Sequence, residues 1–293
     1  MGISSYLQFL ISGLTMGSTY GLTALGFTII FNTTGIINFA QGEFVMLGGM
    51  LSVFFLKWLD MGLGVSIFLS LVTTTLVGAA IEQLTIKPVK DSSIIRLIIV
   101  TIGVSIFIRG LAMLIWGKDT FALPHFSGSS PLTFGGVAVV PQSIWILGIT
   151  LTLLILLRVF FLKTMFGRAM RACSYDTKAS YLVGIGVQKM ILISFMLSAF
   201  VGAIGGAILA PITMTSYDVG IMLGLKGFSA CIIGGLGNPF GAAAGGLLLG
   251  VLESFGAGIV SSAYKDAFAF LILLILLFLR PSGLFGQARV ERV

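Results

Sequence analysis

The sequence has few charged residues, and this scarcity decides its class. Asp, Glu, Lys and Arg make up only 9% of the 293 residues, whereas soluble domains have about 25%. Hydrophobic residues make up 57% of the chain and occur in continuous runs rather than in alternation. This composition excludes a soluble globular domain and favours membrane-spanning helices. We therefore predict an all-α polytopic membrane protein.

Residues that carry enzyme chemistry are also scarce. The chain has one histidine, His125, and two cysteines, Cys173 and Cys231, which lie far apart without metal-binding or redox spacing. No segment fits the P-loop pattern G-x-x-x-x-G-K-[ST], so any ATP would be hydrolysed by another subunit. We expect a non-catalytic membrane protein with no metal or cofactor of its own.

Apolar segments define the predicted spans. Segments long enough, or nearly long enough, to cross about 30 Å of hydrocarbon cover residues 6–31, 44–59, 61–84, 94–116, 142–162, 190–210 and 266–280. An eighth apolar region, residues 221–260, is interrupted by "GGLGNPFGAAAGG". We predict one transmembrane domain over residues 1–293, with about eight transmembrane helices that include broken or re-entrant segments. Glycines spaced by four predict close helix packing, and they include Gly13, Gly17, Gly21, Gly246 and Gly250.

The net charge of +7 comes mainly from a few basic connections, which the positive-inside rule explains more simply than nucleic-acid binding. The segments near 85–96 and 163–189 and the tail from residue 280 are expected in the cytoplasm, and the connection 117–141 outside. This places the N-terminus outside and the C-terminus in the cytoplasm. Residues 221–260 must then begin and end outside, as a re-entrant pair that turns at "GLGNPFG" short of the cytoplasmic side.

One polar stretch, "FNTTGIINFAQGEF", stands between two apolar runs. Polar groups inside a membrane usually mark function, but they also bond helices together. Two roles therefore stay open for this stretch: it lines a translocation pathway, or its side chains satisfy each other as structural contacts. The residues predicted to line the pathway are Asn38, Gln41, Gly42 and Glu43, with Asn238 from the interrupted region.

The connection over residues 163–189 is too long and too patterned for a simple link. We predict a short helix over 166–173 and a second one that is capped by Asp176 and stopped by Gly184. Small residues ringed by charge are suited to a groove on a partner protein. A helix that lies on anionic lipid is the alternative.

Several stretches resemble one family. "GRAMRACSYDTKASYLVGI" resembles the coupling loop of ABC importer permeases, in the variant of the branched-chain amino acid (LivH-type) family. "GSTYGLTALGFTIIFNTTGIINFAQGEFVMLGG" is similar to the N-terminal signature of that family, and "GGLGNPFGAAAGG" and "LRPSGLFG" to its C-terminal pattern. The resemblance covers essentially the whole chain in order, and it implies an ABC importer permease fold.

The resemblance also implies partners and a location. The chain would be one of two permease subunits in a bacterial inner membrane, beside a LivM-like second permease, two ABC ATPase subunits that bind ATP and Mg²⁺, a periplasmic substrate-binding protein and membrane lipid, with no nucleic acid. Residues 163–189 would dock the ATPase subunits. The residues expected in that contact are Gly167, Arg168, Arg171, Ala172, Asp176, Ala179, Leu182 and Gly184.

One position departs from the family pattern. Many members have histidine where this chain has Gln41, so the expected cargo widens from branched-chain amino acids to related small hydrophobic, amide or carboxylate solutes. Related permeases carry urea, short amides or aromatic carboxylates. Two other functions stay open: an ion-coupled secondary transporter, for which Glu82 and Glu253 are candidate ion sites near predicted membrane edges, and a passive channel.

Overall fold

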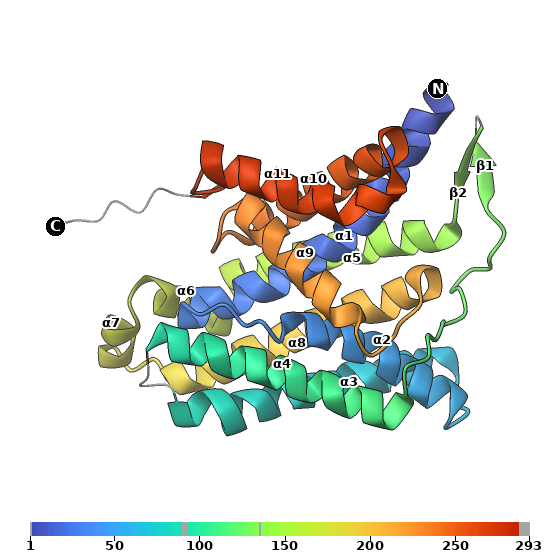
Figure 1. Ribbon diagram of the computed structural model, residues 1–293. Coiled ribbons are helices and arrows are strands. Elements are labelled where there is room, and N and C mark those ends of the chain that lie inside the picture. Colours follow the sequence, from blue (N-terminus) through green and yellow to red (C-terminus); the bar gives the residue numbers. More distant parts are fainter. Residues whose placement is uncertain (1, 90–92, 135, 287–293) are drawn as a thin grey trace.

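The computed structural model describes residues 2–89, 93–134 and 136–286. Most of the chain forms a bundle of long helices, with two short helices at one end and a small β-hairpin at the other (Figure 1). The long helices are α1 (Ile3–Thr34), α2 (Gln41–Lys57), α3 (Leu63–Ile81), α4 (Ile94–Trp116), α5 (Pro141–Lys163), α8 (Val187–Thr213), α9 (Val219–Gly234), α10 (Pro239–Ile259) and α11 (Lys265–Leu279). The short ones are α6 (Met165–Tyr175) and α7 (Thr177–Leu182), and the hairpin pairs β1 (Leu132–Phe134) with β2 (Val137–Val139).

The helices confirm the predicted membrane architecture. Within the described residues, 7 helical segments are long and apolar enough to span a bilayer, and α9 is a shorter apolar helix. One of the seven, Leu63–Val89, is α3 continued by a π-helical turn, η1 (Glu82–Ile86), and a 3₁₀ turn, η2 (Lys87–Val89). The predicted span 94–116 coincides with α4, and the other predicted spans differ only at their ends.

The two ends of the bundle differ in character. We call the end that holds α6 and α7 the basic end, because residues 163–189 lie there. We call the opposite end, which holds the N-terminus and the strands, the hairpin end (Figure 1). The hairpin was not anticipated from the sequence. The Gln8 amide fixes it to the start of α1 through two hydrogen bonds to the backbone of Ala138, both 3.0 Å long.

The polar stretch is a break between two helices, as predicted. α1 ends at Gly35, whose φ of 70° places it in the left-handed region, and its N–H closes the helix on the Phe31 carbonyl. This is the usual glycine ending of a helix. The chain then returns into the bundle, and α2 begins with Gln41 packed against Gly26 in the C-terminal half of the long helix α1.

The interrupted region forms a helical hairpin of α9 and α10, but its turn lies deeper than the charge pattern predicts. Gly235 and Gly237 have φ values of 101° and 90°, which reverse the chain. The Asn32 side chain, near the last turn of α1, donates a 2.9 Å hydrogen bond to the Gly237 carbonyl, so the turn lies at the basic end. The expectation that it stops short of this side is wrong. "GLGN" carries no charge, so the positive-inside rule has no information on its depth.

Glycines let α1 and α10 pack along much of their length. A Cβ added to Gly17 would lie 2.7 Å from the Gly246 carbonyl oxygen, and one at Gly13 would lie 2.9 Å from the Gly250 carbonyl oxygen. Such contacts leave no room for a side chain, which confirms the packing role predicted from the spacing of four.

Candidate functional site: the polar junction at the start of α2

Gln41 joins three helices at one point. Its side chain is fully buried, and its amide nitrogen donates to the Ser198 carbonyl of α8 at 3.4 Å. The Ser198 hydroxyl donates to the Gln41 side-chain oxygen and lies 2.9 Å from the Gly26 carbonyl of α1. Gly26 and Gly202 leave space for the amide, because a Cβ on either would press against the Gln41 side chain. Both ends of the amide are therefore engaged inside this chain.

Asn38 and its neighbour fix the entry to α2. The Asn38 side-chain oxygen accepts a 3.1 Å hydrogen bond from the Ala40 N–H, while its buried amide nitrogen has no partner within the described residues. The Phe39 N–H donates to the Thr101 hydroxyl of α4 at 3.2 Å. The segment before α2 is thus pinned to α4, with one polar group left free.

Glu43 is a buried carboxylate with one free oxygen. The side chain is 1% exposed, and its Oε1 accepts a 2.8 Å hydrogen bond from the Ser105 hydroxyl of α4. Its Oε2 has no partner in the described part of the chain, and a Cβ on Gly220 would lie 2.7 Å from it. Gly42 also presses against the Gly220 backbone, so the first turns of α2 and α9 meet beside this carboxylate.

Two more charged groups act on Glu43. Arg109 of α4 and Asp218, directly before α9, are both within electrostatic range of its carboxylate. Arg109 is half-buried and makes no hydrogen bond or ion pair within the described residues. An arginine inside an apolar span is costly unless it serves a pathway or meets a polar partner. Opposite charges with free hydrogen-bonding capacity suit a small polar or zwitterionic solute.

The structure brings four of the five predicted pathway residues together. Asn38, Gln41, Gly42 and Glu43 all lie in the junction. Asn238 makes its contacts elsewhere, at the turn between α9 and α10, where its Oδ1 caps α10 by accepting from the N–H groups of Phe240 and Gly241, each at 3.1 Å. The pathway role of these residues stays a prediction.

A second polar cluster lies where α1, α9, α10 and the start of α11 meet. The Lys226 ammonium is 2.9 Å from Glu253 and 2.6 Å from Asp266, and the Lys265 ammonium is 3.3 Å from Glu253. The Tyr20 hydroxyl donates to Glu253 at 3.1 Å. Glu253, a candidate ion site in the secondary-transporter alternative, is thus held in ion pairs. The other such candidate, Glu82, is buried in η1 with no partner for its Oε2 in the described chain.

Sequence reasoning missed both Arg109 and Lys226. Each is an isolated basic residue inside an apolar stretch, in "IFIRGLAML" and "GLKGFSA". The positive-inside rule uses only the Lys and Arg residues in the connections between spans, so it gives no information on these two positions. An isolated charge inside an apolar helix was the available signal.

The basic end matches the predicted two-helix connection. Asp176 caps α7 by accepting a 2.9 Å hydrogen bond from the Ala179 N–H, and Gly184 follows with a φ of 85°. α6 turns Met170 and Cys173 into the bundle, and burial raises the pKa of the Cys173 thiol. The segment from Tyr175 to Val183 forms the exposed tip of this connection, apart from the buried Ser180.

The predicted coupling residues are mostly accessible. Arg168, Arg171, Asp176, Ala179, Leu182 and Gly184 are exposed, and Ala172 is half-buried. Gly167 is an exception, because it is buried against the backbone of Phe160 and Phe161 in α5. It therefore packs α6 against α5 and does not face a partner. Leu182 is 85% exposed and stands beside the exposed Tyr181 and Val183, so three consecutive apolar side chains are open to water.

Comparison with known proteins decides the family. A family model described as "Branched-chain amino acid transport system / permease component" matches residues 9–277. The chain belongs to this family. This permease is 34% identical to the high-affinity branched-chain amino acid transport system permease protein BraD of Pseudomonas aeruginosa, with 99% of each chain covered. It is 33% identical to the corresponding LivH protein of Escherichia coli K12, with 98% of each covered.

A more distant relative and one solved structure complete the comparison. The probable branched-chain amino acid transport permease protein LivH of Methanocaldococcus jannaschii is 29% identical, over 90% of this permease and 88% of its own chain. The structure titled "PsaBC from Streptococcus pneumoniae in complex with Fab" aligns at 13% identity with a TM-score of 0.49, over 94% and 92% of the two chains. Family and fold class, both expected from the motifs, are confirmed by the family model and the near-full-length relatives.

Proposed function

We propose that this permease is the membrane subunit of an ATP-driven importer for branched-chain amino acids or related small hydrophobic, amide or carboxylate solutes. The observation that carries the proposal is the similarity to BraD and LivH over nearly the whole of each chain. Those relatives are named as high-affinity branched-chain amino acid permeases. Because the match leaves no large part of either chain uncovered, the same role suits the whole permease rather than one fragment. The subunit itself would be non-catalytic.

A second, LivM-like permease would complete the pathway. The exposure of α4 supports this part of the proposal. Only 17% of the most apolar part of this helix is buried, yet the helix carries Arg109. A guanidinium at that depth needs a polar environment, which lipid tails do not give. A partner permease against α4 would provide that environment and enclose the junction from the open side.

Charge at the junction suits an amino acid as cargo. The free oxygen of Glu43 would meet an ammonium group, and Arg109 would meet a carboxylate, with apolar residues around them for an aliphatic side chain. A periplasmic substrate-binding protein would deliver the cargo from the hairpin end. The N-terminus would then lie outside a bacterial inner membrane and the C-terminus in the cytoplasm.

Two ATPase subunits would drive the cycle from the basic end. The sequence has no P-loop, so ATP and Mg²⁺ would be bound by these partners. The exposed tip around α7, with Tyr181, Leu182 and Val183 at 74%, 85% and 75% exposure, supports docking there. Apolar side chains that are open to water gain free energy when a partner covers them.

Reconstitution tests the proposal. The permease, its partner permease, both ATPases and the binding protein are placed in proteoliposomes, and uptake of leucine, isoleucine and valine is measured with and without ATP. We expect uptake only with ATP and with an intact ATPase. Equal uptake without ATP would contradict the importer and favour a passive channel or an ion-coupled transporter. ATP-dependent uptake of urea but not of leucine would reject the branched-chain cargo and retain the importer.

A further inference from the structure

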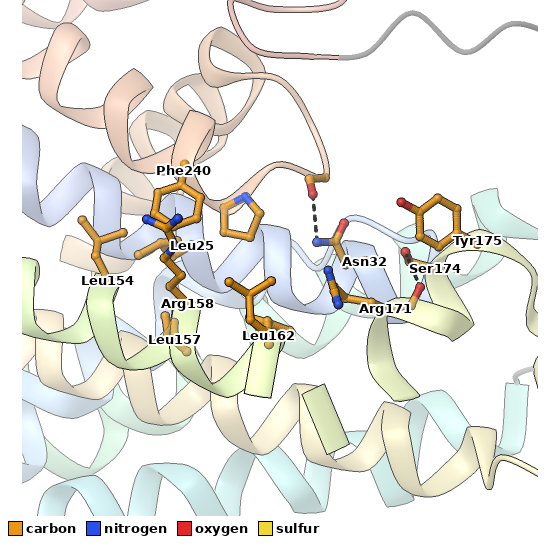
Figure 2. Close-up of a pocket in the computed structure, with 13 residues that line it drawn as sticks. Leu25, Asn32, Leu154, Leu157, Arg158, Leu162, Arg171, Ser174, Tyr175 and Phe240 are labelled. Carbon is orange, nitrogen blue, oxygen red and sulfur yellow. Dashed lines mark hydrogen bonds between the residues drawn. The ribbon is translucent and has the colours of Figure 1, made fainter. Parts of the chain in front are cut away.

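A cavity at the basic end combines two arginines with apolar walls. It has a volume of about 210 Å³ and is lined by residues of α1, α5, α6, the turn between α9 and α10 and the start of α10 (Figure 2). Its charged residues are Arg158 and Arg171, and no acidic residue is among the described residues that line it. Leu25, Leu157 and Phe161 supply part of its apolar surface. The cavity therefore has a net positive charge.

The two guanidinium groups are available for an anion. Arg158 lies over the Phe240 ring at 5.2 Å from its centroid, and neither arginine forms an ion pair within the described chain. Asn32 donates to the Gly237 carbonyl, and the Ser174 hydroxyl to the Arg171 carbonyl at 2.9 Å (Figure 2). Neither neighbour neutralises the charge. Arginine pairs with phosphate and carboxylate through two parallel hydrogen bonds, so each of the two side chains can hold such an anion.

The cavity is continuous with an apolar outer face of α5. Leu151, Ile155, Arg158 and Leu162 follow the three- and four-residue spacing of one helix face. The three apolar members of this stripe are 60%, 55% and 47% exposed, which suits contact with acyl chains. Arg158 thus stands close to the basic end of a surface that fits lipid.

We propose that this cavity binds the phosphate headgroup of an anionic phospholipid from the inner leaflet, with its acyl chains along the exposed stripe of α5. A volume of 210 Å³ is below the roughly 300–1,000 Å³ of small-molecule pockets, so it holds a headgroup and leaves the chains outside. Basic pockets between membrane helices on the cytoplasmic side bind such headgroups. The proposal uses the orientation in the proposed function but does not depend on the cargo.

Such a lipid would connect the coupling connection to the bundle. Arg171 belongs to α6, Arg158 to α5 and Phe240 to the start of α10, so a lipid in the cavity would lie between these three helices. The position of α6 would then depend on the anionic lipid content of the membrane. A protein partner for the same arginines is a competing explanation, and the experiment separates the two.

Native mass spectrometry of the full chain tests the site. Binding of phosphatidylglycerol and of phosphatidylcholine is titrated for the wild type, Arg158→Gln, Arg171→Gln and the double variant. Arg168→Gln is the matched control, since it removes the same charge one turn away on α6, outside the cavity. We expect phosphatidylglycerol affinity to fall about fivefold for each cavity arginine, from about 1 kcal/mol per basic residue. The Arg168→Gln variant should bind like the wild type.

Three results would overturn the proposal. One is equal binding of the two lipids, or a double variant with wild-type phosphatidylglycerol binding. Another is equally tight binding of inorganic phosphate alone, which would make the cavity a free-anion site. The third is a double variant that no longer co-purifies with the ATPase subunits while its lipid binding is unchanged. This would show that the two arginines contact the ATPase rather than a lipid. Because Arg171 is exposed, Arg171→Gln should fold normally, and its thermal stability is measured alongside.

Discussion

The side chains of Gln41 and Ser198 bind each other where α1, α2 and α8 meet. The Ser198 hydroxyl donates to the Gln41 side-chain oxygen, and the Gln41 amide nitrogen donates to the Ser198 carbonyl at 3.4 Å. The two residues are 157 positions apart in the sequence. A polar residue in the membrane thus holds three helices together, whatever its additional part in transport.

Gly26→Ala should destabilise the permease, because its new methyl group would overlap the Gln41 amide. We expect a loss of about 1–3 kcal/mol and a partial recovery when Gln41→Ala is added, since the shorter side chain makes room. Thermal unfolding of the single and double variants in one detergent gives the coupling energy.

Gly103→Ala on α4 is the control, because nothing lies within 4 Å of the position of its added Cβ. Both substitutions raise helix propensity equally. If Gly26→Ala and Gly103→Ala unfold at the same temperature, the Gln41 amide does not pack closely against Gly26.

Lys226→Met should be among the most harmful single substitutions in the chain. It leaves the buried Glu253 carboxylate without its 2.9 Å partner, and Lys265 is a weaker substitute at 3.3 Å and 41% side-chain exposure. Breaking a buried pair costs about 3–5 kcal/mol, while replacing both members by apolar residues costs little. Lys226→Met with Glu253→Leu should therefore recover much of the lost thermal stability.

Asp266→Asn serves as the comparison for this cluster. Asp266 also binds Lys226, at 2.6 Å, but its side chain is 51% exposed, so its loss should cost below about 1 kcal/mol. A double variant less stable than Lys226→Met alone would show that the cluster does not behave as a buried ion pair.

Local patterns were sufficient for much of the fold. Apolar runs located the spans, and the Asp176 side chain and Gly184 marked the ends of α7, because capping depends on neighbours in the sequence. The partners of Gln41 were not predictable, since Ser198 is distant in the chain and serine is common on helix faces. Arg109 could have been found as an isolated charge in an apolar span.

The depth of the turn between α9 and α10 can be checked by cysteine labelling. With Cys173 and Cys231 replaced, Leu236→Cys in the turn and Leu182→Cys at the tip of α7 should react from the cytoplasmic side. Asp119→Cys, in the connection that leads to the hairpin, should react from outside. Leu236 is 40% exposed, so a reagent can reach it. Labelling of positions 236 and 182 from opposite sides would contradict the placement of this turn at the basic end.

Leu182→Ser should weaken ATPase docking without affecting the fold. The side chain is 85% exposed, so its removal costs the isolated permease almost nothing. Burial of a leucine contributes about 1.5–3 kcal/mol, so recovery of the ATPase subunits in co-purification should correspond to an affinity about tenfold or more lower. Leu132→Ser, at a leucine of 43% exposure at the hairpin end, is the control. Equal recovery of the ATPase subunits with the two variants would show that Leu182 is not part of the docking surface.

Glu43→Gln should separate transport from stability at the junction. The amide oxygen can still accept from Ser105, while the free carboxylate oxygen becomes an NH₂ group that repels an ammonium group. A neutral amide is cheaper to bury than a carboxylate, so thermal stability should not fall. Loss of a charge-assisted contact of about 1.5–3 kcal/mol should lower amino acid uptake by about tenfold or more in proteoliposomes that still hydrolyse ATP.

Ser105→Ala is the reciprocal variant, because it removes the donor to Glu43 and keeps the carboxylate. It should lower stability by about 1 kcal/mol and leave most of the uptake intact. Glu43→Gln should therefore affect uptake more than stability, and Ser105→Ala should affect stability more than uptake. Wild-type uptake by Glu43→Gln would exclude this carboxylate from the pathway. If Glu43→Gln instead lost stability and uptake in parallel, the buried carboxylate would have the structural role that Gln41 shows in its contacts with Ser198.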